Sequence, residues 1–194
     1  MKKVLFILFI LTFSSCSNYQ KLLKSDNFDL KFETALSYFN ESKYSRALVL
    51  FEDILSEFKG SNRSEDIYYY YTYSLFYLGD YTSAAYHFNN FSKTFFSSTK
   101  VEEMSFMSAK CYYLDTPPSH YDQSNTFEAI KQLELFISNY PDSENITEAE
   151  NLISKLNLIL EEKEFNIAYS YFKTSKFNSA IYAFNNFIES YPNS

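Results

Sequence analysis

The chain has 194 residues and only two glycines, so it has no glycine-rich loop that could bind a nucleotide phosphate. Its 19 tyrosines and 21 phenylalanines supply enough apolar mass for a folded domain of ordinary size. The net charge of −7 argues against a nucleic-acid partner, whose backbone requires a cationic face, and against a polybasic membrane patch.

The first fifteen residues have the layout of a secretory signal peptide. Two lysines precede an apolar run over residues 4–11, and two small serines follow just before Cys16. The run is too short for a permanent membrane span. The segment Phe-Ser-Ser-Cys at 13–16 resembles the lipobox of bacterial lipoproteins, which implies that Cys16 is lipidated, for example with palmitate. The alternative is an ordinary secreted protein in which this cysteine has no role.

The other cysteine, Cys111, lies among apolar residues and is interpreted as a buried small hydrophobe. With Cys16 acylated, the mature chain can form no internal disulfide. The sequence therefore predicts a signal peptide over 1–15, a lipidated tether over 16–27 and one folded domain over 28–194.

A motif returns four times between residues 44 and 187. An aromatic residue is followed by alanine three positions later and by large apolar residues four and seven positions beyond that alanine. Threonine takes the aromatic position in the third copy. The copies are Tyr44, Ala47, Phe51, Ile54; Tyr81, Ala84, Phe88, Phe91; Thr126, Ala129, Leu133, Phe136; and Phe177, Ala180, Phe184, Phe187. Pro141 and Pro192 close the last two copies.

Steps of three and four place each copy on one face of an α-helix. Another apolar-periodic segment precedes each copy, and these segments span residues 32–39, 67–78, 101–114 and 162–172. A longer helix is expected from 144 to 164. Each motif copy and the segment before it are expected to form a helical hairpin, and this pattern resembles the tetratricopeptide repeat. The predicted fold is an all-α tetratricopeptide-repeat superhelix of about four hairpins.

Stacked hairpins of this kind form a surface that suits a peptide or a helix. In tetratricopeptide repeats the first helix of each hairpin lines that surface. Aromatic residues, tyrosines above all, are frequent at such contacts, although each could instead belong to the core. The candidate peptide-binding residues are Phe32, Phe39, Tyr69, Tyr73 and Tyr77.

The third copy resembles the BamD family of lipoproteins, components of the outer-membrane β-barrel assembly machinery. The residues that carry this resemblance extend from Asp122-Gln123-Ser124-Asn125-Thr126 to Tyr140-Pro141-Asp142-Ser143. The segment 77–81, Tyr-Leu-Gly-Asp-Tyr, is similar to the same family. The resemblance implies a non-enzymatic scaffold, lipid-anchored in the outer membrane and facing the periplasm, that docks on the central barrel subunit and binds unfolded barrel proteins.

The alternative is another periplasmic tetratricopeptide lipoprotein that serves as an envelope or peptidoglycan-assembly adaptor. No metal-ligand cluster, nucleophile elbow or paired cysteines are recognisable in the sequence, and His87 and His120 are its only histidines. The sequence therefore predicts no enzyme, no cofactor, no metal, no nucleic-acid partner and a membrane contact through the lipid anchor alone.

Overall fold

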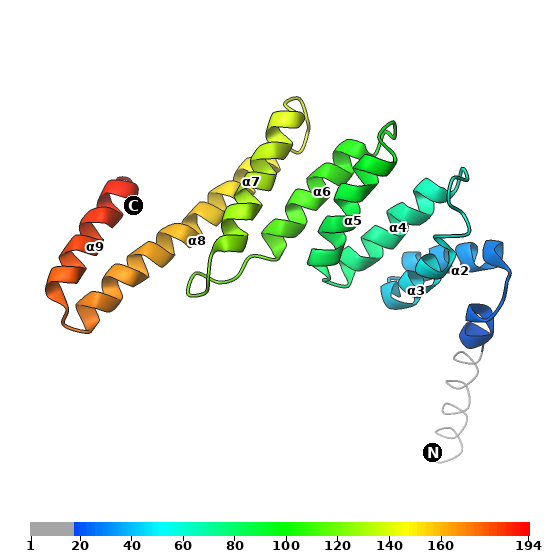
Figure 1. Cartoon of the computed structure of the whole chain (residues 1–194), viewed down its shortest axis with the longest axis horizontal. Helices are drawn as coiled ribbons and strands as arrows, with labels where there is room; N and C mark the ends of the chain where they lie inside the picture. The colour runs from blue at the N-terminus through cyan, green and yellow to red at the C-terminus, as the bar shows by residue number, and fades with distance from the viewer. Residues whose placement is uncertain (1–17) are drawn as a thin grey trace, which may run out of the picture. The chain divides into compact units, whose positions relative to one another are not determined.

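The computed structural model describes residues 18–194, and these residues form helices joined by turns, with no strand among them (Figure 1). A short helix covers residues 18–23. The main helices are α2 (Phe28–Asn40), α3 (Tyr44–Ile54), α4 (Ser64–Tyr77), α5 (Tyr81–Thr94), α6 (Val101–Leu114), α7 (Ser124–Asn139), α8 (Ile146–Lys173) and α9 (Phe177–Ser190). The predicted all-α repeat fold is confirmed. The chain divides into two compact units after Asp80.

The first unit is built on the α2/α3 hairpin, and α4 packs mainly against α3. The motif residues of α3 lie on its inner face, where Ala47, Phe51 and Ile54 are completely buried. Leu50 lies between them and is equally buried. The small alanine lets the neighbouring helix approach, and the large residues around it fill the contact.

The segment predicted as a tether has a defined structure from residue 18 onward. Its half-buried apolar residues are Tyr19, Leu22 and Leu23, and this spacing of three and four places them on one face of the short helix. The Tyr19 hydroxyl donates to the Arg46 carbonyl of α3 at 3.2 Å. The segment therefore packs on the first hairpin. Its polar composition concealed this apolar face, because the face holds only three residues.

Three helix ends have the same backbone turn. Ser42, Gly79 and Ser175 have positive φ angles of 58°, 80° and 57°. In each turn the residue after the one with positive φ donates its backbone N–H to the carbonyl five residues earlier. In the turn after α2, the Lys43 N–H donates to the Tyr38 carbonyl at 2.8 Å. These are Schellman caps, which place a left-handed residue just after the helix. Glycine suits that position best, yet serine occupies two of the three.

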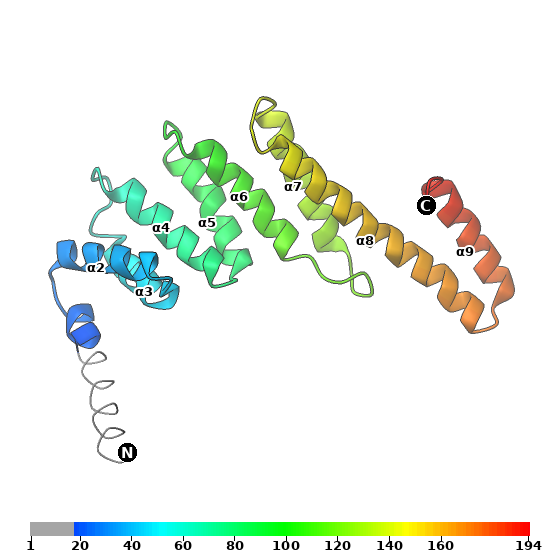
Figure 2. The same ribbon diagram turned by 180° about the vertical axis from the view of Figure 1, so that it is seen from behind.

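The second unit is a series in which each helix packs on the next, from α5 through α6, α7 and α8 to α9 (Figure 2). Its fully buried large residues include Phe88, Phe91, Met104 and Leu133. Ser108 of α6 donates to the Ala85 carbonyl of α5 at 3.0 Å. Small side chains thus allow close helix contacts in this unit too.

The third motif copy departs from the aromatic pattern for a visible reason. Thr126 is completely buried and its hydroxyl bonds Gln123 Oε1 at 2.6 Å. The Gln123 amide in turn donates to the carbonyls of Pro118 and Tyr121 at 2.9 and 3.1 Å. Threonine replaces the aromatic residue because the inserted loop over residues 115–123 needs this buried polar anchor.

Helix α8 is continuous over 28 residues and joins the two helical segments expected around residue 162. Its N-terminal half is anchored by Ala149, Leu152 and Leu156, which are buried. In its C-terminal half only Ala168 is buried. The α8/α9 hairpin therefore exposes much more apolar surface than the helices before it.

Candidate binding surface

Aromatic side chains from α2, α3 and α4 gather in the first unit, where α2 ends and α3 begins. Phe39 and Tyr44 make an edge-to-face contact, with ring centroids 5.4 Å apart. Tyr77, at the end of α4, stacks on Tyr44 at 4.6 Å and contacts Phe39 at 5.9 Å. Three helices thus contribute one ring each to a continuous contact.

A second line of rings follows α4. Tyr69 contacts Tyr73 at 4.7 Å, and Tyr73 contacts Tyr77 at 5.9 Å. These residues stand four apart, so they follow one another along the same helix face. We define the aromatic cluster as Phe39, Tyr44, Tyr69, Tyr70, Tyr73 and Tyr77.

Sequence reasoning assigned no binding role to Tyr70, although it lies at the centre of the cluster. Its ring contacts Phe39 at 5.0 Å, Tyr69 at 5.2 Å and the buried ring of Phe51 at 5.9 Å. Tyr70 precedes Tyr77 by seven residues, two helical turns, and this spacing could have identified it. It connects the cluster to the core.

The cluster is partly open to solvent. Tyr77 is 50% exposed, and Leu78 beside it is 45% exposed. Phe39, Tyr44, Tyr69 and Tyr70 are half-buried, while Tyr73 is buried. Aromatic rings held in fixed contact lose little conformational freedom when a ligand covers them. The arrangement can therefore bind aromatic or apolar side chains of a polypeptide through ring faces and edges.

Phe32 lies apart from these rings. It is 8% exposed, and its ring contacts Phe58 at 6.4 Å. The Arg63 guanidinium lies 5.4 Å from the same ring. Phe32 therefore packs in the core between α2 and the turn after α3, while the other four candidates lie together.

One ion pair lies in the turn beside the cluster. Lys43 donates to the Glu41 carboxylate at 2.5 Å, and both side chains are about half exposed. The hydrogen bond from Lys43, with a second from Ser37, holds the pKa of the Glu41 carboxyl below its usual range. These neighbouring charges compensate each other, so ring contacts rather than a net charge dominate this surface.

The remaining predicted residues occupy two kinds of position. Cys16 lies outside the described residues. Cys111 is fully buried, and burial raises the pKa of its thiol to about 12. A thiol of this kind is a poor nucleophile near neutral pH. Within residues 18–194 no group of three or more His, Cys, Asp or Glu side chains could hold a metal ion.

The residues predicted to pack the repeats differ in burial along the chain. The buried ones are Ala47, Phe51, Ala84, Phe88, Ala129, Leu133 and Ala180. Tyr44, Tyr81 and Phe184 are half-buried. Pro141 and Pro192 are exposed, and Phe177 is 56% exposed. The alanine is thus the position that is buried in every copy.

Among the helices of residues 18–194, none has the length and apolar character needed to cross a bilayer. No curated protein matches the chain. A family model described as outer membrane lipoprotein, YfiO, matches residues 26–194, which includes every main helix. The chain therefore belongs to the YfiO family of outer membrane lipoproteins, the family that corresponds to BamD.

Proposed function

We propose that this protein is a non-enzymatic scaffold lipoprotein of the outer-membrane β-barrel assembly machinery. In this role it is acylated at Cys16, faces the periplasm, docks on the central barrel subunit and binds unfolded barrel proteins. The observation that carries the proposal is the family match over residues 26–194. A body of helical hairpins supports it, because such bodies present extended surfaces to other polypeptides.

The aromatic cluster is the surface that we assign to unfolded clients. Strands of outer-membrane barrels alternate apolar and polar residues and carry aromatic girdles at both membrane interfaces. An extended client segment therefore offers an apolar or aromatic side chain at every second position. Ring contacts of about 0.5–1.5 kcal/mol each can hold such a segment weakly and release it.

The client surface is tested with Tyr77→Ser and Phe39→Ser in the mature chain. Removing either ring should weaken binding of an unfolded barrel segment about tenfold, because its contacts with the bound segment are lost. The matched control is Tyr86→Ser: Tyr86 is 66% exposed on α5 and lies outside the cluster. Fluorescence anisotropy of a labelled strand peptide gives the affinity. Equal affinity in all three variants would remove the cluster from the client surface.

The complex is tested separately, by affinity purification of the acylated protein from outer membranes. The proposal expects the central barrel subunit as a stoichiometric partner. Recovery of soluble periplasmic proteins or peptidoglycan enzymes in its place would favour the envelope-adaptor alternative.

A further inference from the structure

Residues 18–27 are fixed to the first hairpin at two separate points. At the first, the Tyr19 ring meets the Tyr38 ring of α2 edge to face, with centroids 5.8 Å apart. The Arg46 guanidinium of α3 lies 5.5 Å from both rings. The Tyr19 hydroxyl also donates to the Arg46 carbonyl. This half-buried tyrosine therefore joins the short helix to both helices of the hairpin.

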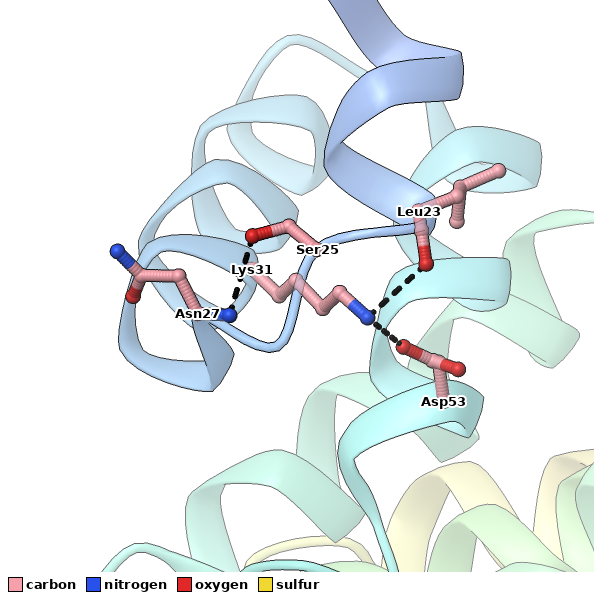
Figure 3. Close-up of polar contacts among 5 residues, drawn as sticks. All are labelled: Leu23, Ser25, Asn27, Lys31 and Asp53. Carbon is pink, nitrogen blue, oxygen red and sulfur yellow. Dashed lines mark hydrogen bonds and ion pairs between the residues drawn. The ribbon is translucent and has the colours of Figure 1, made fainter.

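The second point is the ammonium group of Lys31 (Figure 3). Lys31 follows Phe28 by three residues and precedes Ala35 by four, so the helix period places it on the buried face of α2. Only 4% of its side chain is exposed. A buried ammonium must find acceptors, because leaving it unpaired carries a large desolvation cost.

Lys31 finds these acceptors on two other elements. Its Nζ donates to the Leu23 carbonyl, at the end of the short helix, at 3.1 Å and forms an ion pair with Asp53 of α3. Figure 3 shows the Lys31 side chain extending from α2 so that its ammonium nitrogen reaches both the Leu23 carbonyl and the Asp53 carboxylate. One ammonium thus ties residues 18–27, α2 and α3 together.

The turn between the short helix and α2 is itself ordered by local hydrogen bonds. Ser25 Oγ accepts from the Asn27 backbone N–H at 3.1 Å, and Asn27 Oδ1 caps α2 by accepting from the Leu30 N–H at 3.0 Å. The Ser25 N–H bonds the Leu22 carbonyl at 3.0 Å. Local hydrogen bonds therefore connect the short helix to α2 through a defined turn.

This segment directly follows the cysteine that the proposed function assigns as the lipid anchor. Tyr19 follows Cys16 by three positions, so their Cα atoms are at most about 11 Å apart. Lys21 is exposed on the short helix, Lys24 is exposed in the turn just after it, and the Arg46 guanidinium lies beside Tyr19. Residues 18–27 hold two lysines and one acidic residue, Asp26, and cations near a bilayer attract anionic headgroups.

We propose that residues 18–27 form a rigid connector that holds the α2/α3 hairpin against the phospholipid surface in which acylated Cys16 is anchored. The inference rests on the acylation included in the proposed function. The connector fixes which face of the first unit meets the headgroups. A loose tether of the same length would let that unit turn freely.

The rigidity is tested without the lipid, in the mature chain carrying Cys16→Ala. Trypsin can cut after Lys21 and Lys24 only when the connector leaves the hairpin. Tyr19→Ala and Lys31→Met should each accelerate that cleavage about tenfold or more, since each removes one fixing point. The matched control is Lys59→Met, in the exposed turn after α3, which should not change the rate.

Circular dichroism checks that each variant keeps its helices. Tyr19 lies outside the buried core, so Tyr19→Ala keeps the test valid if Lys31→Met fails to fold. Cleavage of the parent chain as rapid as that of both variants would overturn the rigid connector.

The membrane contact is tested with the acylated protein in vesicles of phosphatidylethanolamine and phosphatidylglycerol. A fluorophore on Ser45→Cys reports the exposed side of α3 next to Arg46, and Cys111 is too buried to react. Spin-labelled lipids should quench this fluorophore. A spacer of about ten Gly and Ser residues between Ser17 and Asn18, with a mean reach of about 17 Å, should abolish the quenching.

Quenching that is absent, or that survives the spacer, would overturn the membrane contact. Failure of the acylated protein to associate with vesicles at all would overturn the lipid anchoring in the proposed function. The trypsin measurement still decides the rigid connector in that case, so the two failures are distinguishable.

Discussion

The first hairpin, α2/α3, and the last, α8/α9, have the same motif and the same turn. Their motif side chains are buried to different extents. Phe51 in α3 is completely buried, whereas Phe184, at the same position in α9, is half-buried. Ala47 and Ala180 are buried in both hairpins. In the first unit α4 covers α3, while the outer face of α9 exposes Ile181 and Ile188 at 61% each. The motif therefore specifies a hairpin, and a neighbouring helix is needed to complete its core.

The largest expected difference between the two hairpins is at the phenylalanine position. Phe51→Ala should cost about 3–5 kcal/mol, because it leaves a cavity between α3 and α4. Phe184→Ala should cost about 1 kcal/mol, since part of that ring is already in water. Urea unfolding followed by circular dichroism measures both. Equal losses would mean that the hairpins are equally packed and would break the comparison.

The alanine position should show no such contrast. Ala47→Phe and Ala180→Phe should each cost about 1–3 kcal/mol, because both alanines sit at a close contact within their own hairpin. The thermal midpoint of each variant checks this. An unchanged midpoint for Ala180→Phe would show that the α8/α9 contact is not close at this residue.

Substitutions at the positive-φ residue of the turn should change stability equally in the two hairpins, and by less than the substitutions above. Ser42→Gly and Ser175→Gly should each stabilise the protein by roughly 0.5–1 kcal/mol, since glycine adopts the positive φ without a Cβ clash. Gly79→Ser, at the equivalent turn, should destabilise by a similar amount. The shift in the urea midpoint gives the sign, and a loss on Ser42→Gly would contradict the cap assignment.

The smallest effect concerns acid stability in the second unit. Asp122 accepts from the Ser124 N–H at 2.9 Å, and hydrogen bonds from Ser124 lower the pKa of its carboxyl. A lowered folded pKa stabilises the fold above the ordinary value of 3.8, and this contribution disappears as the pH falls through the lowered value.

Asp122→Asn should therefore reduce the fall in thermal midpoint between about pH 5 and about pH 2.5 by a small amount. In the first unit, Glu41 is the carboxyl group comparable to Asp122, because the hydrogen bond from Lys43 lowers its pKa. Glu41→Gln should act in the same direction. A steeper acid loss in either variant would contradict the sign.

The repeat pattern was sufficient to predict the fold class, because steps of three and four between large apolar residues have one physical meaning. It could not reveal how the residues between the motifs pack. Lys31 is polar in the sequence but buried, since its acceptors come from Leu23 and Asp53, which lie 8 and 22 residues away. Contacts of this kind depend on tertiary structure.

The candidate surface was predictable to a lesser degree. Helix position identified Phe39, Tyr69, Tyr73 and Tyr77, which lie together. The same rule also selected Phe32, because apolar periodicity does not distinguish a ring that faces a ligand from one that faces Phe58. The spacing of seven residues from Tyr77 could have identified Tyr70, but its central place in the cluster comes from contacts with Phe39 and Phe51 on other helices, which the sequence does not show.

The most direct test of the assembly role is to deplete the protein in its native cells and measure folded barrels in the outer membrane by heat-modifiable mobility on gels. The account predicts that folded barrels of many kinds fall together and that Tyr86→Ser restores them. It also predicts that a chain carrying both Phe39→Ser and Tyr77→Ser restores them poorly. Unchanged levels of folded barrels after depletion would contradict it.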